Sequence, residues 1–224
     1  PGAVMFSDGG PDIRWIGNEQ GFAGETNWST LNRDDFYPGV PNKTKALNEG
    51  QEGGTHWLPG EVDVSIRPGW FYHADQDDKV KTPDKLMHIW LESVGRNANL
   101  LLNFPIDQRG LVHENDQAAV LAMHKKIETF TANDVALGAV VRASNFRDAY
   151  QPSTVVDGKP DTFWATEDGV TTAAIEVEFS TSEVIHGIDI AEHIQLGQRV
   201  RSFVVEAQTK NGWEEVAKGT TIGH

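Results

Sequence analysis

The side chains that could do chemistry are densest in one loop-rich stretch near the N-terminal end. Residues 8–28 hold several carboxylates, one arginine and two tryptophans, among them Asp12, Arg14, Trp15 and Glu19. An aromatic ring covers the apolar face of a pyranose while charged groups bond its hydroxyls, so this set suits a sugar site. The residues alone leave a second interpretation open, a glycine-rich surface loop with solvated acids.

A second cluster follows between residues 56 and 73. Glu61, Asp63 and Ser65 alternate along a predicted strand, so their side chains face one side of it. The aromatic run Trp70-Phe71-Tyr72 comes soon after. In a half-barrel, the carboxylate side of the strand could be the polar mouth of a site, whereas the aromatic run could equally be core.

The elements that position these residues alternate between strands and helices over residues 1–130. Apolar runs predict short strands at 3–7, 26–30, 62–66 and 99–106. Helices are predicted after the N-cap Thr82 and from about residue 115. Strands separated by helices or long loops indicate parallel βα units, whose loops after the strands form the active-site face. About four strands are visible where a closed barrel needs eight, so we predict the second half of a (β/α)8-like barrel.

The pattern changes after Phe130. Residues 173–179 alternate strictly, 185–190 and 203–207 read as further strands, and Asn211-Gly212 is a hairpin signal. Short strands without intervening helices predict an antiparallel β-sandwich of jelly-roll type. The fold class is therefore α/β plus all-β, with domains over 1–130 and 131–224, the sandwich being incomplete.

Composition excludes several classes of protein. With 19 Lys and Arg against 33 Asp and Glu the net charge is −14, which argues against a nucleic-acid binder because phosphate contacts need a basic surface. No apolar run reaches the roughly 18 residues of a membrane-spanning helix. The chain has no cysteine, so disulfides, thiolate metal sites and a thiol nucleophile are excluded. It starts without an initiator Met or a signal peptide, and we interpret it as an internal piece of a longer protein.

Three segments, in this order along the chain, resemble the second half of the catalytic domain of family 29 α-L-fucosidases. They are Phe6–Glu19, Gly60–Tyr72 and Asn97–Asn103. The run Trp15-Ile16-Gly17-Asn18-Glu19 is the most specific part, and the resemblance covers about residues 1–130. More narrowly, the segments are similar to the subgroup acting on α-1,3/1,4-linked fucose in Lewis-type glycans. Separately, residues 156–213 resemble a discoidin-like (galactose-binding-like) sandwich.

The fucosidase resemblance implies a retaining glycosidase that uses two carboxyl groups about 5–5.5 Å apart. The nucleophilic Asp would lie upstream of Pro1. The acid/base maps to Glu19, which must be protonated as the leaving oxygen departs and ionised when water attacks. Glu61 is the runner-up for this role, and otherwise a carboxylate that orients substrate.

Two further residues are implied as substrate-binding. Arg14 would hold sugar hydroxyls or the nucleophilic carboxylate, with a surface ion pair as the alternative. Trp70 would pack on the apolar side of the 6-deoxy sugar, with core packing as the alternative.

The implied activity is hydrolysis of terminal α-L-fucose from a fucosylated oligosaccharide or glycoconjugate, without a cofactor. Family sandwiches of this kind allow a structural Ca²⁺, for which the sequence shows no ligand set, and His56, His73 and the aspartates at 75–78 lack metal-ligand spacing. We expect a periplasmic or extracellular location. The alternative function is a carbohydrate-binding protein with an inactive barrel and a lectin-like sandwich.

Overall fold

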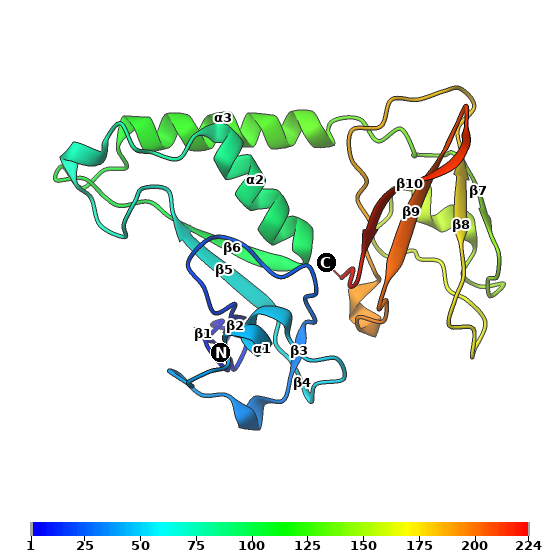
Figure 1. The fold of residues 1–224 in the computed structure, drawn as a ribbon, viewed down its shortest axis with the longest axis horizontal. Coiled ribbons are helices and arrows are strands. Elements are labelled where there is room, and N and C mark those ends of the chain that lie inside the picture. The colour runs from blue at the N-terminus through cyan, green and yellow to red at the C-terminus, as the bar shows by residue number, and fades with distance from the viewer. Residues whose placement is uncertain (1, 224) are drawn as a thin grey trace. The chain divides into compact units, whose positions relative to one another are not determined.

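The computed structural model describes residues 2–223 and divides into two compact units. One unit comprises the residues up to Ile127 together with those from Gln198 onward, and the other is Glu128–Gly197 (Figure 1). Among the described residues, no helix has the length and apolar character needed to cross a membrane.

A four-stranded parallel sheet organises the first unit. Its strands are β1 (Phe6–Ser7), β2 (Ile13–Trp15), β5 (Gly60–Ser65) and β6 (Ala98–Asn103), in the order β1-β2-β5-β6. All three neighbouring pairs are parallel, which confirms the predicted βα arrangement. Of the strand predicted at 26–30, only Thr30 is in a strand, the short β3 (Thr30–Leu31), which lies outside this sheet. The sequence did not predict β2, whose three residues are too few to show a period.

Helices follow the strands as predicted. The helix α2 (Pro83–Ser93) begins after Thr82, whose hydroxyl accepts a bond of 3.3 Å from the amide of Lys85. The helix α3 spans Glu114–Thr131. Smaller elements are α1 (Thr44–Glu49), the antiparallel pair β3 (Thr30–Leu31) and β4 (His56–Trp57), and short 3-10 turns at Arg33–Asp35, Ala74–Gln76, Val94–Arg96, Pro152–Val156 and Ile194–Leu196.

The sheet has one apolar and one polar face along β5. Val62 and Val64 are buried, and Val64 lies near Ile89 of α2 around the backbone of Gly21. A core cluster joins Ile66 after β5 to Leu86 of α2 and Ala119 of α3, with Leu102 of β6 packed against it. Glu61 and Asp63 therefore point to the opposite face, away from this core.

The C-terminal part consists of antiparallel pairs, as predicted. The strand β7 (Val140–Ala143) pairs with β8 (Ile175–Glu178), and β9 (Phe203–Thr209) pairs with β10 (Gly212–Gly219) across the predicted turn, where Gly212 has a φ of 110°. The strand predicted at 185–190 is wrong, since these residues are assigned to no strand.

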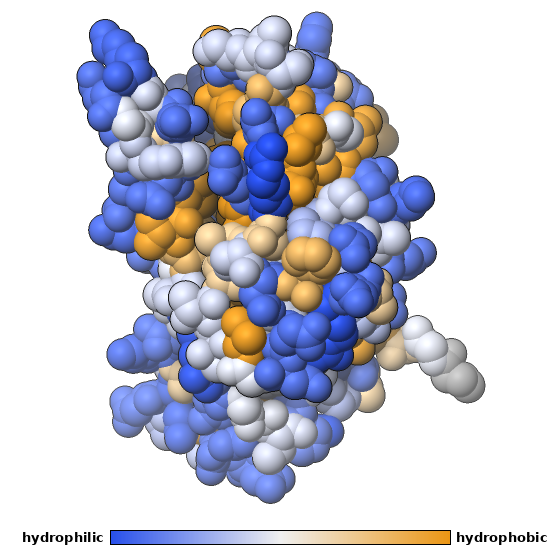
Figure 2. Space-filling model, turned by 90° about the vertical axis from the view of Figure 1, so that its right-hand side faces the viewer, coloured by the Kyte–Doolittle hydropathy of each residue, from blue (hydrophilic) through white to orange (hydrophobic). Residues whose placement is uncertain are grey.

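Apolar side chains reach the surface in this C-terminal part. Figure 2 shows apolar side chains at the molecular surface. Exposed apolar side chains include Val184 and Ile188 in the second unit, and Val204 and Val216 in the β9–β10 hairpin of the first. The apolar residues at 185–190 are therefore not part of a strand, because β-propensity by itself does not provide a neighbouring strand to pair with.

The last residues of the first unit bond to its loop before β3. The amide of Ser29 donates to Oε1 of Gln198 at 2.8 Å, and Nε2 of Gln198 donates to the carbonyl of Asn27 at 2.9 Å. The amide of Asn27 donates to the hydroxyl of Thr221 at 2.9 Å. Asn27 and Ser29 are both buried, so these bonds satisfy backbone groups that water does not reach.

We predict that Gln198→Ala lowers the free energy of unfolding by about 1–3 kcal/mol, since it removes the partner of the buried Ser29 amide, whereas the Asn27 carbonyl keeps its bond from Asn97. Urea unfolding of the variant measures this. The control is Gln208→Ala on the exposed side of β9. An equal, small effect of the two substitutions would contradict the prediction.

Candidate active site

Two residues predicted for the site meet at the carboxyl ends of neighbouring strands. Glu19 lies in the loop after β2 and Trp70 in the loop after β5. The indole Nε1 of Trp70 donates to Oε2 of Glu19 at 2.9 Å. Glu19 is exposed and Trp70 is half-buried, so this contact sits at the surface of the first unit.

A second indole–carboxylate bond lies beside the first. Trp15 of β2 stands opposite Glu61 in the parallel register, which places its side chain on the carboxylate face of the sheet. Its Nε1 donates to Oδ1 of Asp63 at 2.8 Å. The face therefore carries two tryptophans, each of which orients one carboxylate.

The carboxylates on this face interact electrostatically. Burial, and then the charge of Asp63, raise the pKa of Glu61. Burial also raises the pKa of Asp63, as does the charge of Glu19, against the opposing effect of the Trp15 hydrogen bond. Neighbouring negative charges raise the pKa of a carboxyl group and so help it to take up a proton. Such raised pKa values are typical of acid–base sites.

Polar residues at the ends of β5 and β6 hold the loop that carries Trp70. The hydroxyl of Ser65 donates to the carbonyl of Gly69 at 2.6 Å, and Nδ2 of Asn103 donates to the carbonyl of Trp70 at 3.1 Å. The same Nδ2 lies 3.1 Å from the hydroxyl of Ser65. Sequence reasoning missed this role of Asn103, because the predicted strand at 99–106 placed this residue inside the strand, whereas β6 ends at it.

A buried ion-pair network braces the same loop from its other side. Nε of Arg67 lies 2.9 and 2.8 Å from the two carboxylate oxygens of Asp116 at the start of α3, and both side chains are buried. A second guanidinium nitrogen donates to Asp77 at 2.8 Å, and Asp77 also accepts from the hydroxyl of Tyr72 at 3.3 Å. Asp77, one of the aspartates at 75–78, is therefore a member of this ion-pair network.

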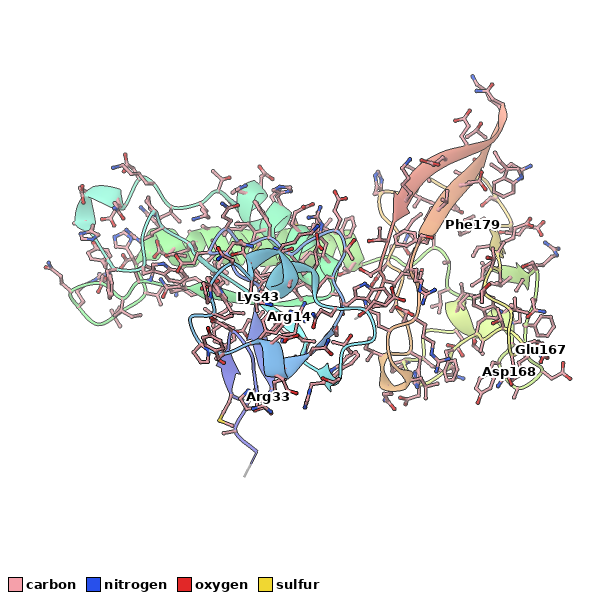
Figure 3. All side chains as sticks on the ribbon, turned by 60° about the horizontal axis from the view of Figure 1, so that its bottom comes forward. Arg14, Arg33, Lys43, Glu167, Asp168 and Phe179 are labelled. Atoms are coloured by element: carbon pink, nitrogen blue, oxygen red, sulfur yellow. The ribbon has the colours of Figure 1, made fainter. Side chains whose placement is uncertain are left out.

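Arg14 is placed apart from the carboxylates. It is fully buried, and Figure 3 shows it beneath α1. Nε donates to the carbonyl of Leu47 at 2.8 Å, and the other two nitrogens donate to the carbonyl of Leu58 and, at 2.7 Å, to Oδ1 of Asn27. Burial lowers its pKa to about 10. Because it is enclosed by protein, it is not placed to face a sugar, and within residues 2–223 it does not form the ion pair that was the alternative. Its bonds instead join β2 to the helix α1 and to the loops that hold Leu58 and Asn27.

The described part of the chain holds no group of three or more His, Cys, Asp or Glu side chains arranged to bind a metal ion. Glu19, Glu61 and Asp63 are thus a set of carboxylates on one face rather than a ligand set. What this arrangement offers chemically is proton transfer beside aromatic rings, which suits a polar substrate with an apolar face.

We predict that Asp63→Asn lowers the pKa of Glu61, because it removes the neighbouring negative charge. A carboxyl NMR titration of the wild-type protein and the variant measures the shift. The matched control is Asp84→Asn, which neutralises a carboxylate that pairs with Lys126 elsewhere on the first unit. An unchanged titration of Glu61 in Asp63→Asn would contradict the electrostatic coupling.

We also predict that Asp116→Ala destabilises the fold by about 3–5 kcal/mol, because it leaves the buried Arg67 guanidinium without its main partner. Chemical unfolding provides the measurement. The surface pair between Lys126 and Asp84 gives the comparison, since Asp84→Ala should cost only about 0–1 kcal/mol. Similar losses of unfolding free energy in the two variants would contradict a stabilising role of the buried Arg67–Asp116 pair.

Comparison with known proteins gives consistent matches. Residues 29–130 match the family model described as alpha-L-fucosidase, and residues 140–224 match the F5/8 type C domain. The chain is 38% identical over 230 residues to "Alpha-L-fucosidase 1" of Arabidopsis thaliana, covering 100% of this chain and 45% of that protein. It therefore spans about half the length of the curated relatives that it matches.

Solved structures agree with the family matches. A putative alpha-L-fucosidase from Bacteroides thetaiotaomicron is similar with a TM-score of 0.89 and 36% identity, over 99% of this chain and 50% of the other. A Ruminococcus gnavus GH29 fucosidase in complex with fucose is similar with a TM-score of 0.83 and 30% identity, over 98% of this chain and 45% of the other.

Proposed function

Because this chain belongs to the alpha-L-fucosidase family, glycoside hydrolase family 29, we propose that the protein it is part of hydrolyses terminal α-L-fucosyl linkages. The chain is the second half of the barrel-like catalytic domain followed by an F5/8 type C, discoidin-like β-sandwich, as predicted. The observation that carries the proposal is the bond from Trp70 to Glu19, which orients one carboxylate at the carboxyl end of the parallel sheet.

Glu19 is the acid/base of the proposed reaction. Its carboxyl donates a proton to the glycosidic oxygen as the bond to the fucose breaks, and later takes a proton from the attacking water. Trp70 occupies Oε2 of Glu19, which leaves the other carboxylate oxygen for the leaving group. The exposure of Glu19 supports this role, since the leaving group and the water must both reach it.

The finer parts of the proposal are the stereochemistry and the substrate. We propose retention by double displacement, with an Asp outside this chain attacking the anomeric carbon, and α-1,3/1,4-linked fucose of Lewis-type glycans as the substrate. Both rest on the resemblance of Phe6–Glu19, Gly60–Tyr72 and Asn97–Asn103 to that subgroup. The fucosylated nature of the substrate is further supported by the fucose bound to the Ruminococcus gnavus relative.

The remaining predicted residues take supporting roles. Glu61 orients substrate, because its raised pKa and its position one strand away from the Glu19 loop suit a hydrogen-bonding carboxyl. Trp70 packs against fucose and also fixes Glu19. Arg14 is left out of the proposed substrate contacts, since each of its three nitrogens already donates to a protein oxygen. A periplasmic or extracellular location stays a prediction.

Glu19→Ala in the full-length protein tests the central role. We expect kcat/KM to fall by about 10²–10⁴-fold on a fucosyl disaccharide, whose leaving group needs protonation, and far less on a dinitrophenyl fucoside. Azide should partly restore hydrolysis of the dinitrophenyl fucoside. The control is Glu25→Ala, an exposed carboxylate of the same loop.

Equal losses on the two substrates would assign the acid/base to another residue, and Glu61→Ala is the variant to compare. A wild-type protein that binds fucosylated glycans but hydrolyses neither substrate would support the alternative, a carbohydrate-binding protein with an inactive barrel.

A further inference from the structure

Phe71 is an exposed aromatic ring on a tightly held segment. Its side chain is 79% exposed, the largest exposed fraction among the large apolar side chains of the described residues. The residues on both sides of it are anchored. Trp70 donates to Glu19 and accepts from Asn103 through its carbonyl, while the ring of Tyr72 lies 4.9 Å from the Arg67 guanidinium.

This anchoring lowers the entropic cost of a contact with Phe71. The residues on either side are already held by bonds to Glu19 in the loop after β2, to Asn103 of β6 and to the Arg67 network, so a ligand that touches the ring has only two side-chain torsions to fix. An apolar ring of this size gains free energy from burial, and its flat face matches the apolar C–H face of a pyranose.

The position of Phe71 relative to Glu19 indicates which part of a substrate it meets. A general acid must lie about 2.6–3.2 Å from the oxygen that it protonates, and in a fucoside that oxygen belongs to the leaving sugar. The first ring of the leaving sugar therefore begins at the Glu19 carboxyl. Phe71 follows Trp70, which touches this carboxyl, and consecutive Cα atoms are about 3.8 Å apart.

The high exposure of Phe71 separates it from the fucose itself. A ligand site encloses the part of the ligand that it recognises. An enzyme that acts on a terminal sugar therefore encloses that sugar, while the rest of the glycan extends outward. Trp70 is half-buried beside the carboxylate face, as a contact to fucose requires. Phe71, in the same loop, is exposed and so remains available to a part of the glycan that lies outside this enclosure.

We propose that Phe71 is a specificity-determining residue whose ring stacks on the pyranose of the leaving group, next to Glu19. The inference rests on the proposed function and deepens it, because it assigns a residue to the sugar that is released rather than to the fucose. Its ligand class is a neutral pyranoside bearing the fucosyl group.

The test uses the full-length protein and two substrates that differ only in the leaving group. A fucosyl disaccharide presents a leaving sugar, whereas α-L-fucosyl fluoride presents none. For Phe71→Leu we expect kcat/KM on the disaccharide to fall about 3- to 10-fold, mainly through KM, and to stay unchanged on the fluoride. Phe71→Tyr, which keeps the ring, should retain the wild-type value on both substrates.

The control variant is Trp213→Leu, another exposed aromatic in the β9–β10 hairpin, and thermal unfolding of each variant reports on the fold. Equal losses on both substrates, no loss on either, or a Phe71→Tyr variant as impaired as Phe71→Leu would overturn the stacking role. A wild-type protein that hydrolyses neither substrate would instead overturn the proposed function.

Discussion

The parallel pairing of β2 with β5 is the constraint on which the rest of the site depends. Arg14 stands opposite Gly60, and Trp15 opposite Glu61. A Cβ at position 60 would come within 2.8 Å of the Ile16 side chain and 3.5 Å of the Arg14 guanidinium, so the glycine lets both side chains pack against the β5 backbone without shifting. A shift of one residue would turn Trp15 and the β5 carboxylates to opposite faces. With the observed register, the loops carrying Glu19 and Trp70 leave the sheet side by side.

The polar side chains divide into those that support the sheet and those that face outward from it. Arg14 and Arg67 are both fully buried, and their partners are protein carbonyls, an amide and two aspartates. Their bonds hold loops on the two sides of the carboxylate face. Glu19, Glu61 and Asp63 remain accessible to a ligand. In a chain of net charge −14, the buried cations thus stabilise structure, and the accessible anions are the groups to which we assign the proposed chemistry.

The sequence predicted an element correctly where its hydrophobic pattern was long enough to show a period. The helix α2 has a cap, a proline and four apolar positions in phase, and the structure confirms it. The strand β2 has only three residues inside a loop-like stretch, so no hydrophobic period could reveal it. The strand was instead expected at 26–30, where the structure has a buried loop before β3. The resemblance led to Glu19 and Trp70, which the structure brings into contact. It could not reveal Asn103 or the Arg67–Asp116 pair, because these contacts join residues 33 and 49 positions apart.

The most direct test of the acid/base assignment is the distance between side chain 19 and the glycosidic oxygen in an uncleaved complex. The complex is the full-length Glu19→Gln variant bound to a fucosyl disaccharide, solved by crystallography. Our account predicts that this side chain lies within about 2.6–3.2 Å of the oxygen, with the Trp70 indole on its far side. A glycosidic oxygen that instead contacts Glu61, with side chain 19 directed into solvent, would contradict it.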